Sequence, residues 1–130
     1  MSATKTNAAA EALVDRYIAT WNETDPAKRR ALIAATFTAA VSYRDPLASS
    51  DGFDQVDALI AGVQQRFPAH RFRALGKIDS HGDRLRFQWA LAEGDAEALV
   101  IGTDVAVLAA DNRMQSVTGF FDRVPAPPAT

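Results

Sequence analysis

Residues 84–92 read Arg-Leu-Arg-Phe-Gln-Trp-Ala-Leu-Ala, and this stretch decides the fold class. Large apolar side chains occupy every second position, and charged, polar or small side chains stand between them. A period of two residues is typical of a β-strand with one buried and one exposed face, because successive side chains of a strand point to opposite sides. The stretch therefore predicts a half-buried strand of an antiparallel sheet.

Turn-forming residues lie on both sides of this strand. Glycine and short polar residues gather at 80–83, 93–95 and 111–112, where they favour tight turns. They divide the second half of the chain into strands near 70–79, 84–92, 97–109 and 113–123, and a short extra strand is expected at 41–44.

The first half of the chain changes to a period of about 3.6 residues, which is typical of amphipathic helices. Three helices are predicted, over about 7–22 with Asn7 as N-cap, from Pro26 toward Phe37 with Asp25 as N-cap, and from near Asp54 to Phe67. Grouped helices followed by a meander of strands form an α+β fold, in which the sheet must curl over the helices to cover its apolar face. A sheet curled in this way can enclose a pocket.

Composition limits the class of protein. A chain of 130 residues makes one domain, 1–130, and we expect it to be ordered over about 7–124 with mobile ends. It carries 14 Lys and Arg against 16 Asp and Glu, so it lacks the basic excess of a nucleic-acid-binding protein. No apolar run is long enough to cross a bilayer. Neither nucleic acid nor a membrane is therefore an expected partner.

The chain has no cysteine, and its N-terminus does not resemble a secretion signal, so we expect a cytoplasmic location. The common sequence patterns of metal, phosphate and dinucleotide sites are also missing. We therefore expect no metal and no cofactor.

Asp104 lies in the middle of the apolar strand 97–109, where an ionised carboxylate is costly unless it is paired, hydrogen-bonded or protonated. Gly102 and Ala106 flank it on the same side of the strand and leave space beside it. A protonated Asp104 could donate to a developing oxyanion, or the residue could instead cap the backbone or pair with an arginine. Because the strand is apolar on both faces, we also expect burial on both sides, with a homodimer partner as the second cover.

Two further polar residues lie at positions from which their side chains could face a pocket. Asp45 ends the short strand and precedes Pro46, so it is either a turn residue or a general base at the pocket mouth. Alternation places Tyr43 on the same side of that strand. Tyr17 lies on the apolar stripe of the first helix, and its hydroxyl bonds either to backbone or water in the core or to a group inside a pocket.

With these residues in place, the chain resembles the nuclear transport factor two-like superfamily, and within it the ketosteroid isomerases and the SnoaL-like polyketide cyclases. The similarity covers about residues 14–121 and rests on Arg16-Tyr17-Ile18, Asp45-Pro46-Leu47, and Asp104-Val105 followed by Arg113-Met114-Gln115 and Phe120-Phe121. The resemblance implies a dimeric, cone-like fold, with three N-terminal helices packed on a strongly curved antiparallel sheet that encloses a pocket.

The resemblance also implies a set of roles. Asp45 matches the general base, and Tyr17 and a neutral Asp104 match the two donors of an oxyanion hole. Further tyrosines that support the oxyanion tyrosine in some isomerases are replaced here by Phe37 and Ile60. We expect the apolar wall of the pocket to contact the ligand through Trp21, Phe37, Ile60, Trp89 and Phe120.

Two classes of function remain open. The first is a cofactor-free enzyme that acts on a small hydrophobic carbonyl compound by proton transfer through an enolate, with cyclisation or epoxide opening as a variant that reuses the same cavity. The second is a module of the same fold that binds a small apolar ligand, or a dimer partner, without catalysis.

Overall fold

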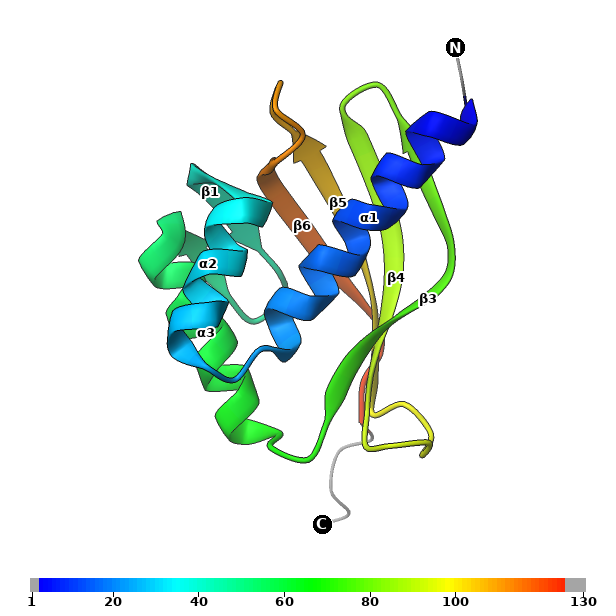
Figure 1. Cartoon of the computed structure of the whole chain (residues 1–130). Coiled ribbons are helices and arrows are strands. Elements are labelled where there is room, and N and C mark those ends of the chain that lie inside the picture. The colour runs from blue at the N-terminus through cyan, green and yellow to red at the C-terminus, as the bar shows by residue number, and fades with distance from the viewer. Residues whose placement is uncertain (1–2, 126–130) are drawn as a thin grey trace.

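The computed structural model describes residues 3–125, so most of the predicted mobile ends, residues 1–2 and 126–130, lie outside the described residues. Three helices and six strands follow one another as α1 (Ala3–Asn22), α2 (Pro26–Thr36), β1 (Phe37–Arg44), β2 (Ser49–Asp51), α3 (Gly52–Arg66), β3 (Arg71–His81), β4 (Arg84–Ala92), β5 (Val100–Leu108) and β6 (Met114–Arg123) (Figure 1). The predicted α+β class, with helices first and a sheet afterwards, is confirmed.

The helix boundaries follow from local chemistry. Before α2, the Asp25 side chain accepts a hydrogen bond from the Lys28 backbone N–H at 2.9 Å, and Pro26 occupies the first turn, as predicted. α1 begins at Ala3, so Asn7 lies inside the helix and the prediction that it is the N-cap was wrong. Three alanines at 8–10, the residue type with the highest helix propensity, follow Asn7 directly, so the helix continues through Asn7 instead of beginning there.

The strands form one six-stranded sheet in the order β2-β1-β6-β5-β4-β3. All neighbours pair antiparallel except β1 and β6, which run parallel, so the sheet is mixed. Alternating side chains show that a segment is a strand but not which way its neighbour runs. The short β2 has the sequence Ser-Ser-Asp, which carries no strand pattern, and it was not predicted.

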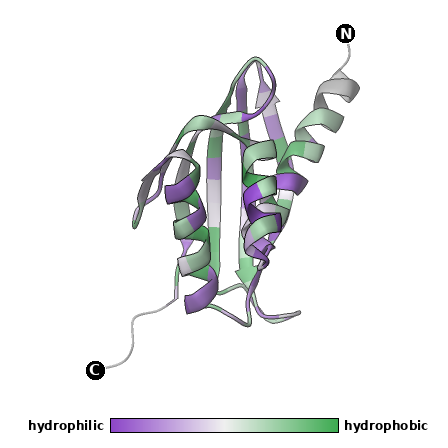
Figure 2. Cartoon of the chain, turned by 60° about the vertical axis from the view of Figure 1, so that its left-hand side comes forward, coloured by the Kyte–Doolittle hydropathy of each residue, from purple (hydrophilic) through white to green (hydrophobic). Residues whose placement is uncertain are grey.

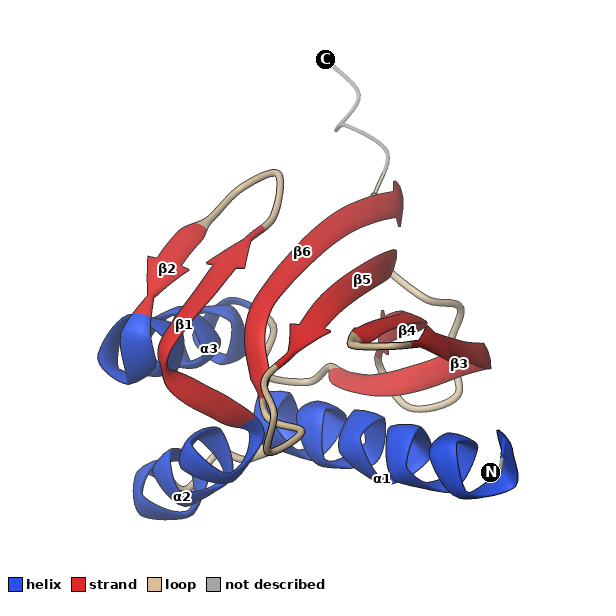
Figure 3. Ribbon diagram, turned by 90° about the horizontal axis from the view of Figure 1, so that it is seen from above, coloured by secondary structure: helices blue, strands red, loops and turns tan. Residues whose placement is uncertain are grey.

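The helices pack against the sheet, which bends around them without closing into a barrel (Figure 3). Hydrophobic and hydrophilic segments alternate along the strands (Figure 2). The core fills the space between the sheet and the helices, and its largest fully buried side chains include Phe37, Phe87, Ile33, Ile60, Leu85 and Met114. No helix within residues 3–125 has the length and apolar character of a membrane span.

The two faces of β5 differ in burial. Gly102, Asp104 and Ala106 are buried on the inner face, whereas Ile101 and Val105 on the outer face are half-buried. The predicted burial of both faces is therefore incomplete in a single chain. That a second copy of the chain covers the outer face stays a prediction.

Candidate functional site

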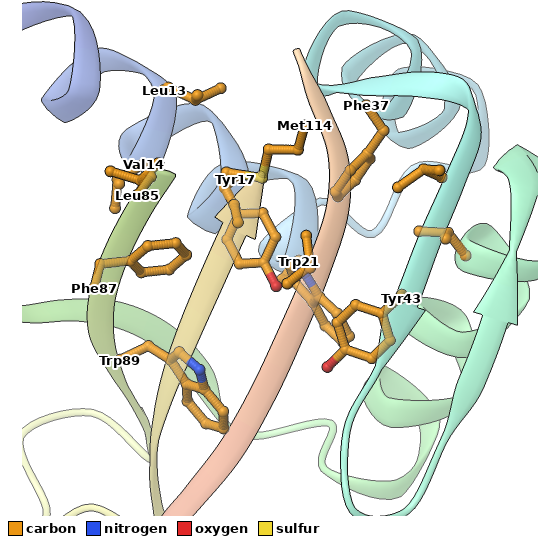
Figure 4. Packing of buried hydrophobic residues seen from close by; sticks show 14 of the residues in the cluster. Leu13, Val14, Tyr17, Trp21, Phe37, Tyr43, Leu85, Phe87, Trp89 and Met114 are labelled. Atoms are coloured by element: carbon orange, nitrogen blue, oxygen red, sulfur yellow. The ribbon is translucent and has the colours of Figure 1, made fainter. Parts of the chain in front are cut away.

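A cavity of about 730 Å³ lies between the sheet and helices α1 and α3. Its size matches that of small-molecule sites, and its walls are mainly aromatic and aliphatic. Figure 4 shows Tyr17 and Trp21 from α1, Tyr43 from β1 and Trp89 from β4, which bring polar atoms to this otherwise apolar region. The lining residues with polar groups include Tyr17, Trp21, Tyr43, Asp45, Trp89 and Asp104.

Asp104 is almost fully buried and binds two donors. The Tyr17 hydroxyl donates to Oδ2 at 2.6 Å, and the Trp89 indole N–H donates to Oδ1 at 3.0 Å. Burial raises the pKa of Asp104 to about 6, although both hydrogen bonds lower it, and the nearby charge of Asp45 raises it. Burial also raises the pKa of Tyr17 well above its ordinary value, so Tyr17 remains a neutral donor.

Two glycines make this arrangement possible. A Cβ atom at Gly102 would stand 2.2 Å from the Trp89 ring, so only glycine lets the indole lie over β5. A Cβ atom at Gly119 would stand 2.8 Å from Asp104 Oδ1 and 3.3 Å from Asp45 Cβ. Gly119 on β6 therefore allows the two aspartates to approach the same point from the strands on either side, Asp104 from β5 and Asp45 from the end of β1.

Asp45 combines the two roles that the sequence left open. Its Oδ1 accepts the backbone N–H groups of Leu47 and Ala48, each at 2.8 Å, which is the hydrogen-bond pattern of an Asx turn. Its Oδ2 accepts the Tyr43 hydroxyl at 2.7 Å, and Asp45 is one of the residues that line the cavity. A carboxylate has about four lone-pair sites, so Oδ2 keeps one free to accept a further proton or donor.

Two functional contacts were not predicted. Tyr43, which is 4% exposed, binds Asp45, and the alternation of β1 already placed the two side chains on one side. Trp89 was expected only as apolar wall, yet its N–H binds Asp104. The two residues are diagonal neighbours across β4 and β5, because Trp89 stands opposite Gly102. That contact depends on strand register, which the sequence pattern did not reveal.

The structure brings Tyr17, Asp45 and Asp104 to one cavity, together with Trp21 and Trp89. Three other residues that were expected at the ligand do not line it, namely Phe37, Ile60 and Phe120. These three expectations require correction.

Each of the three has a physical reason to lie elsewhere. Phe37 is fully buried and packs edge-to-face on Tyr17 at 5.9 Å between ring centroids, so the Tyr17 ring stands between it and the cavity. Ile60, on α3, is fully buried in the core. Phe120 is 55% exposed, because the period of two on β6 directs its neighbour Phe121 into the cavity instead.

The hydrogen bonds also bear on the protonation state of Asp104. Both of its oxygens accept hydrogen bonds, so the residue is held here as an acceptor, whereas the resemblance implies a neutral donor. With a pKa of about 6, the neutral form is reached by a modest fall in pH or by proton transfer from a ligand. Within residues 3–125, no three carboxylate or histidine side chains gather as a metal site would require.

Comparison with protein-family models gave no match, and comparison with curated proteins gave none either. Solved structures do match. A structure from Agrobacterium tumefaciens, described as a candidate isomerase of the SnoaL-like family, is 34% identical, with a TM-score of 0.84, over 89% of this chain and 99% of the other.

Two more distant structures share the fold. A candidate SnoaL-like polyketide cyclase from Jannaschia is 17% identical with a TM-score of 0.69, over 94% of this chain and 95% of the other. An NTF2-like protein of unknown function from Exiguobacterium is 22% identical with a TM-score of 0.63, over 86% of this chain and 99% of the other. The fold, the near-complete coverage and the identity to the Agrobacterium protein together lead to one conclusion: the chain belongs to the SnoaL-like family and has the fold of NTF2-like proteins.

Proposed function

We propose that the protein is a cofactor-free enzyme that moves a proton on a small hydrophobic carbonyl compound. The observation that carries the proposal is the convergence of Tyr17, Asp45 and Asp104 on one largely apolar cavity of about 730 Å³. An apolar site with a few convergent polar groups is the usual form of a small-molecule active site. The Agrobacterium relative, which is described as a candidate isomerase, supports the same reaction class.

In this proposal, the free lone pair of Asp45 Oδ2 takes a proton from the carbon next to the carbonyl group. The C–H electron pair forms the C=C bond, and the carbonyl π pair moves to oxygen, which gives an enolate. Neutral Asp104 and the Tyr17 hydroxyl donate hydrogen bonds to that oxygen at the base of the cavity. Asp45 then returns the proton to the same carbon or to another carbon of the conjugated system.

The proposed active form needs Asp104 protonated while Asp45 is ionised. Because burial raises the pKa of Asp104 to about 6, the share of neutral Asp104 falls as the pH rises through 6. We predict that turnover falls about tenfold for each pH unit above that value. A pH–rate profile that is flat from pH 5 to 8 would show that neutral Asp104 is not required.

Exchange of carbon-bound hydrogen tests the proposal before any product is known. Hydrophobic ketones are incubated with the protein in deuterated buffer, and deuterium uptake beside the carbonyl is followed by NMR. We expect uptake with the wild type and a loss of about 10² to 10⁴ in Asp45→Asn, which keeps an oxygen for the turn but is not a base. Equal uptake in wild type and Asp45→Asn would remove Asp45 from the mechanism.

A non-catalytic binding module is the second candidate, and one observation favours it. All three groups already have partners within the chain, and Asp45 serves a turn as well as the cavity. A module of this kind would bind hydrophobic ring compounds and cause no exchange in any of them. That combination of results would select the second candidate over the first.

A further inference from the structure

Trp89 occupies an unusual place for a residue of an apolar wall. Its indole lies over the bare backbone of Gly102, only 7% of the residue is exposed, and its N–H donates to Asp104 Oδ1 at 3.0 Å. The ring also packs edge-to-face against Phe72 and Phe121, at 5.4 and 6.3 Å between centroids. Contacts on several sides therefore hold the N–H on the carboxylate.

The groups that face Asp104 come from α1, from β1 and the turn after it, and from the two neighbouring strands β4 and β6. Tyr17 on α1 donates to Oδ2, Asp45 after β1 raises the pKa of Asp104, and Asp104 in turn raises the pKa of Tyr43 on β1. Gly119, opposite on β6, and Phe87, opposite on β4, offer no charge. Arg66 on α3 is the one cationic side chain among the described residues that line the cavity. No described cation binds Asp104, so its two neutral donors are the groups that stabilise the ionised form.

We propose that Trp89 is a positioning residue that holds Asp104 as a hydrogen-bond acceptor, and that the cavity consequently selects hydroxylic ligands in their neutral form over the corresponding anions. An enol or a phenol can donate its proton to an ionised Asp104. An enolate or a phenolate beside ionised Asp104 and Asp45 would be repelled, so it binds only with neutral Asp104, the form that the proposed reaction uses and that the Trp89 N–H disfavours.

The inference rests on the proposed function only in its choice of ligand, a small hydrophobic compound that carries a hydroxyl or carbonyl oxygen. Its first part concerns the ligand-free protein. Removal of the indole N–H takes away a donor to the ionised form and leaves the neutral form less affected, so the pKa of Asp104 must rise. For a ligand that shares one proton with Asp104, the same change moves this proton from the ligand onto Asp104.

The test compares Trp89→Phe with Trp21→Phe. Both changes remove one indole N–H from the same cavity, but only the Trp89 N–H donates to Asp104. Protein labelled with ¹³C at aspartate carboxyl carbons is titrated by NMR, and Asp104→Asn identifies the Asp104 signal. We expect the Asp104 midpoint to rise by about one unit in Trp89→Phe and to stay within a few tenths of a unit in Trp21→Phe.

A ligand measurement follows on the same proteins. Substituted 2-naphthols are bound, and ultraviolet absorbance gives the ratio of bound naphtholate to bound naphthol. A midpoint shift of about one unit predicts a roughly tenfold rise of this ratio in Trp89→Phe. A variant with benzothienylalanine at position 89 replaces the N–H by sulfur and keeps the ring shape, so the test stands if Trp89→Phe does not fold.

The outcomes separate this inference from the proposed function. An unchanged Asp104 midpoint in both position-89 variants, or an equal shift in Trp21→Phe, overturns the role of Trp89. A raised midpoint with an unchanged naphtholate ratio overturns the ligand selection. A raised midpoint without naphthol binding to any of the proteins supports the role of Trp89 and counts against the proposed function alone.

Discussion

At Asp104, burial and hydrogen bonding act in opposite directions. Removal of the carboxylate from water favours the neutral acid, while the Tyr17 hydroxyl and the Trp89 N–H favour the ionised form. Burial has the larger effect, so the pKa of Asp104 is raised to about 6 from the ordinary 3.8. The residue is thus placed to exchange a proton near neutral pH, which a purely structural acceptor has no need to do.

This pKa makes a prediction about stability. A raised carboxyl pKa in the folded state adds stability that is fully present below pH 3.8 and is lost as the pH rises through about 6. Between pH 5 and pH 8, we expect the free energy of unfolding of the wild type to fall by about 1.4 kcal/mol relative to Asp104→Asn. Urea unfolding of both proteins at the two pH values measures the difference, and a pH-independent difference would contradict the raised pKa.

The sequence predicted site residues where a polar side chain stands at a position that is usually apolar or structural. A carboxylate on an apolar strand, an aspartate at a strand end and a tyrosine on a helix stripe identified Asp104, Asp45 and Tyr17 without structural information. The contact of Trp89 with Asp104 could not be predicted in this way, because it depends on the register of two strands and on the missing side chain of Gly102. Tyr43 could have been recognised, since alternation already paired it with Asp45.

Among the elements, the packing of the Trp89 ring from β4 over β5 depends on Gly102. We predict that Gly102→Ala destabilises the protein by about 2 to 3 kcal/mol, because its Cβ would stand 2.2 Å from the Trp89 ring and 2.9 Å from the Phe120 carbonyl oxygen. Gly62→Ala is the matched control in α3, where a Cβ meets nothing within 4 Å. It should stabilise by about 0.5 to 1 kcal/mol. Equal effects in urea unfolding would show that Trp89 is not seated on Gly102.

Element type was predictable where the hydrophobic period was long, as in β4, whose predicted range 84–92 agrees with the structure. The ends of the strands, and the directions in which neighbouring strands run, were less predictable. β1 begins at Phe37, four residues before the predicted start, with an irregular register against β6 between Phe37 and Ser42. The parallel pairing of β1 with β6 joins segments far apart in the chain, and a local pattern carries no signal for such a contact.

At the scale of the whole molecule, the outer face of the sheet is incompletely covered. Ile101 and Val105 are half-buried there, and Phe120 is 55% exposed. We propose that a second copy of the chain covers this face. Sedimentation velocity at micromolar concentration should give twice the 14.0 kDa of one chain, and Phe120→Asp should shift the species toward the monomer. A wild type that sediments as a monomer would contradict a homodimer.

The proposed function requires that Tyr17 and Asp104, at the base of the cavity, bind the oxygen of a small hydrophobic ligand. Titration with 2-naphthol, followed by ultraviolet absorbance, tests it most directly in the wild type and in Asp104→Leu. We predict saturable binding to the wild type and a loss of at least about tenfold in Asp104→Leu, since a hydrogen bond to a buried charged group contributes about 1.5 to 3 kcal/mol. Equal affinity in two folded proteins, or no binding to either, would contradict the claim.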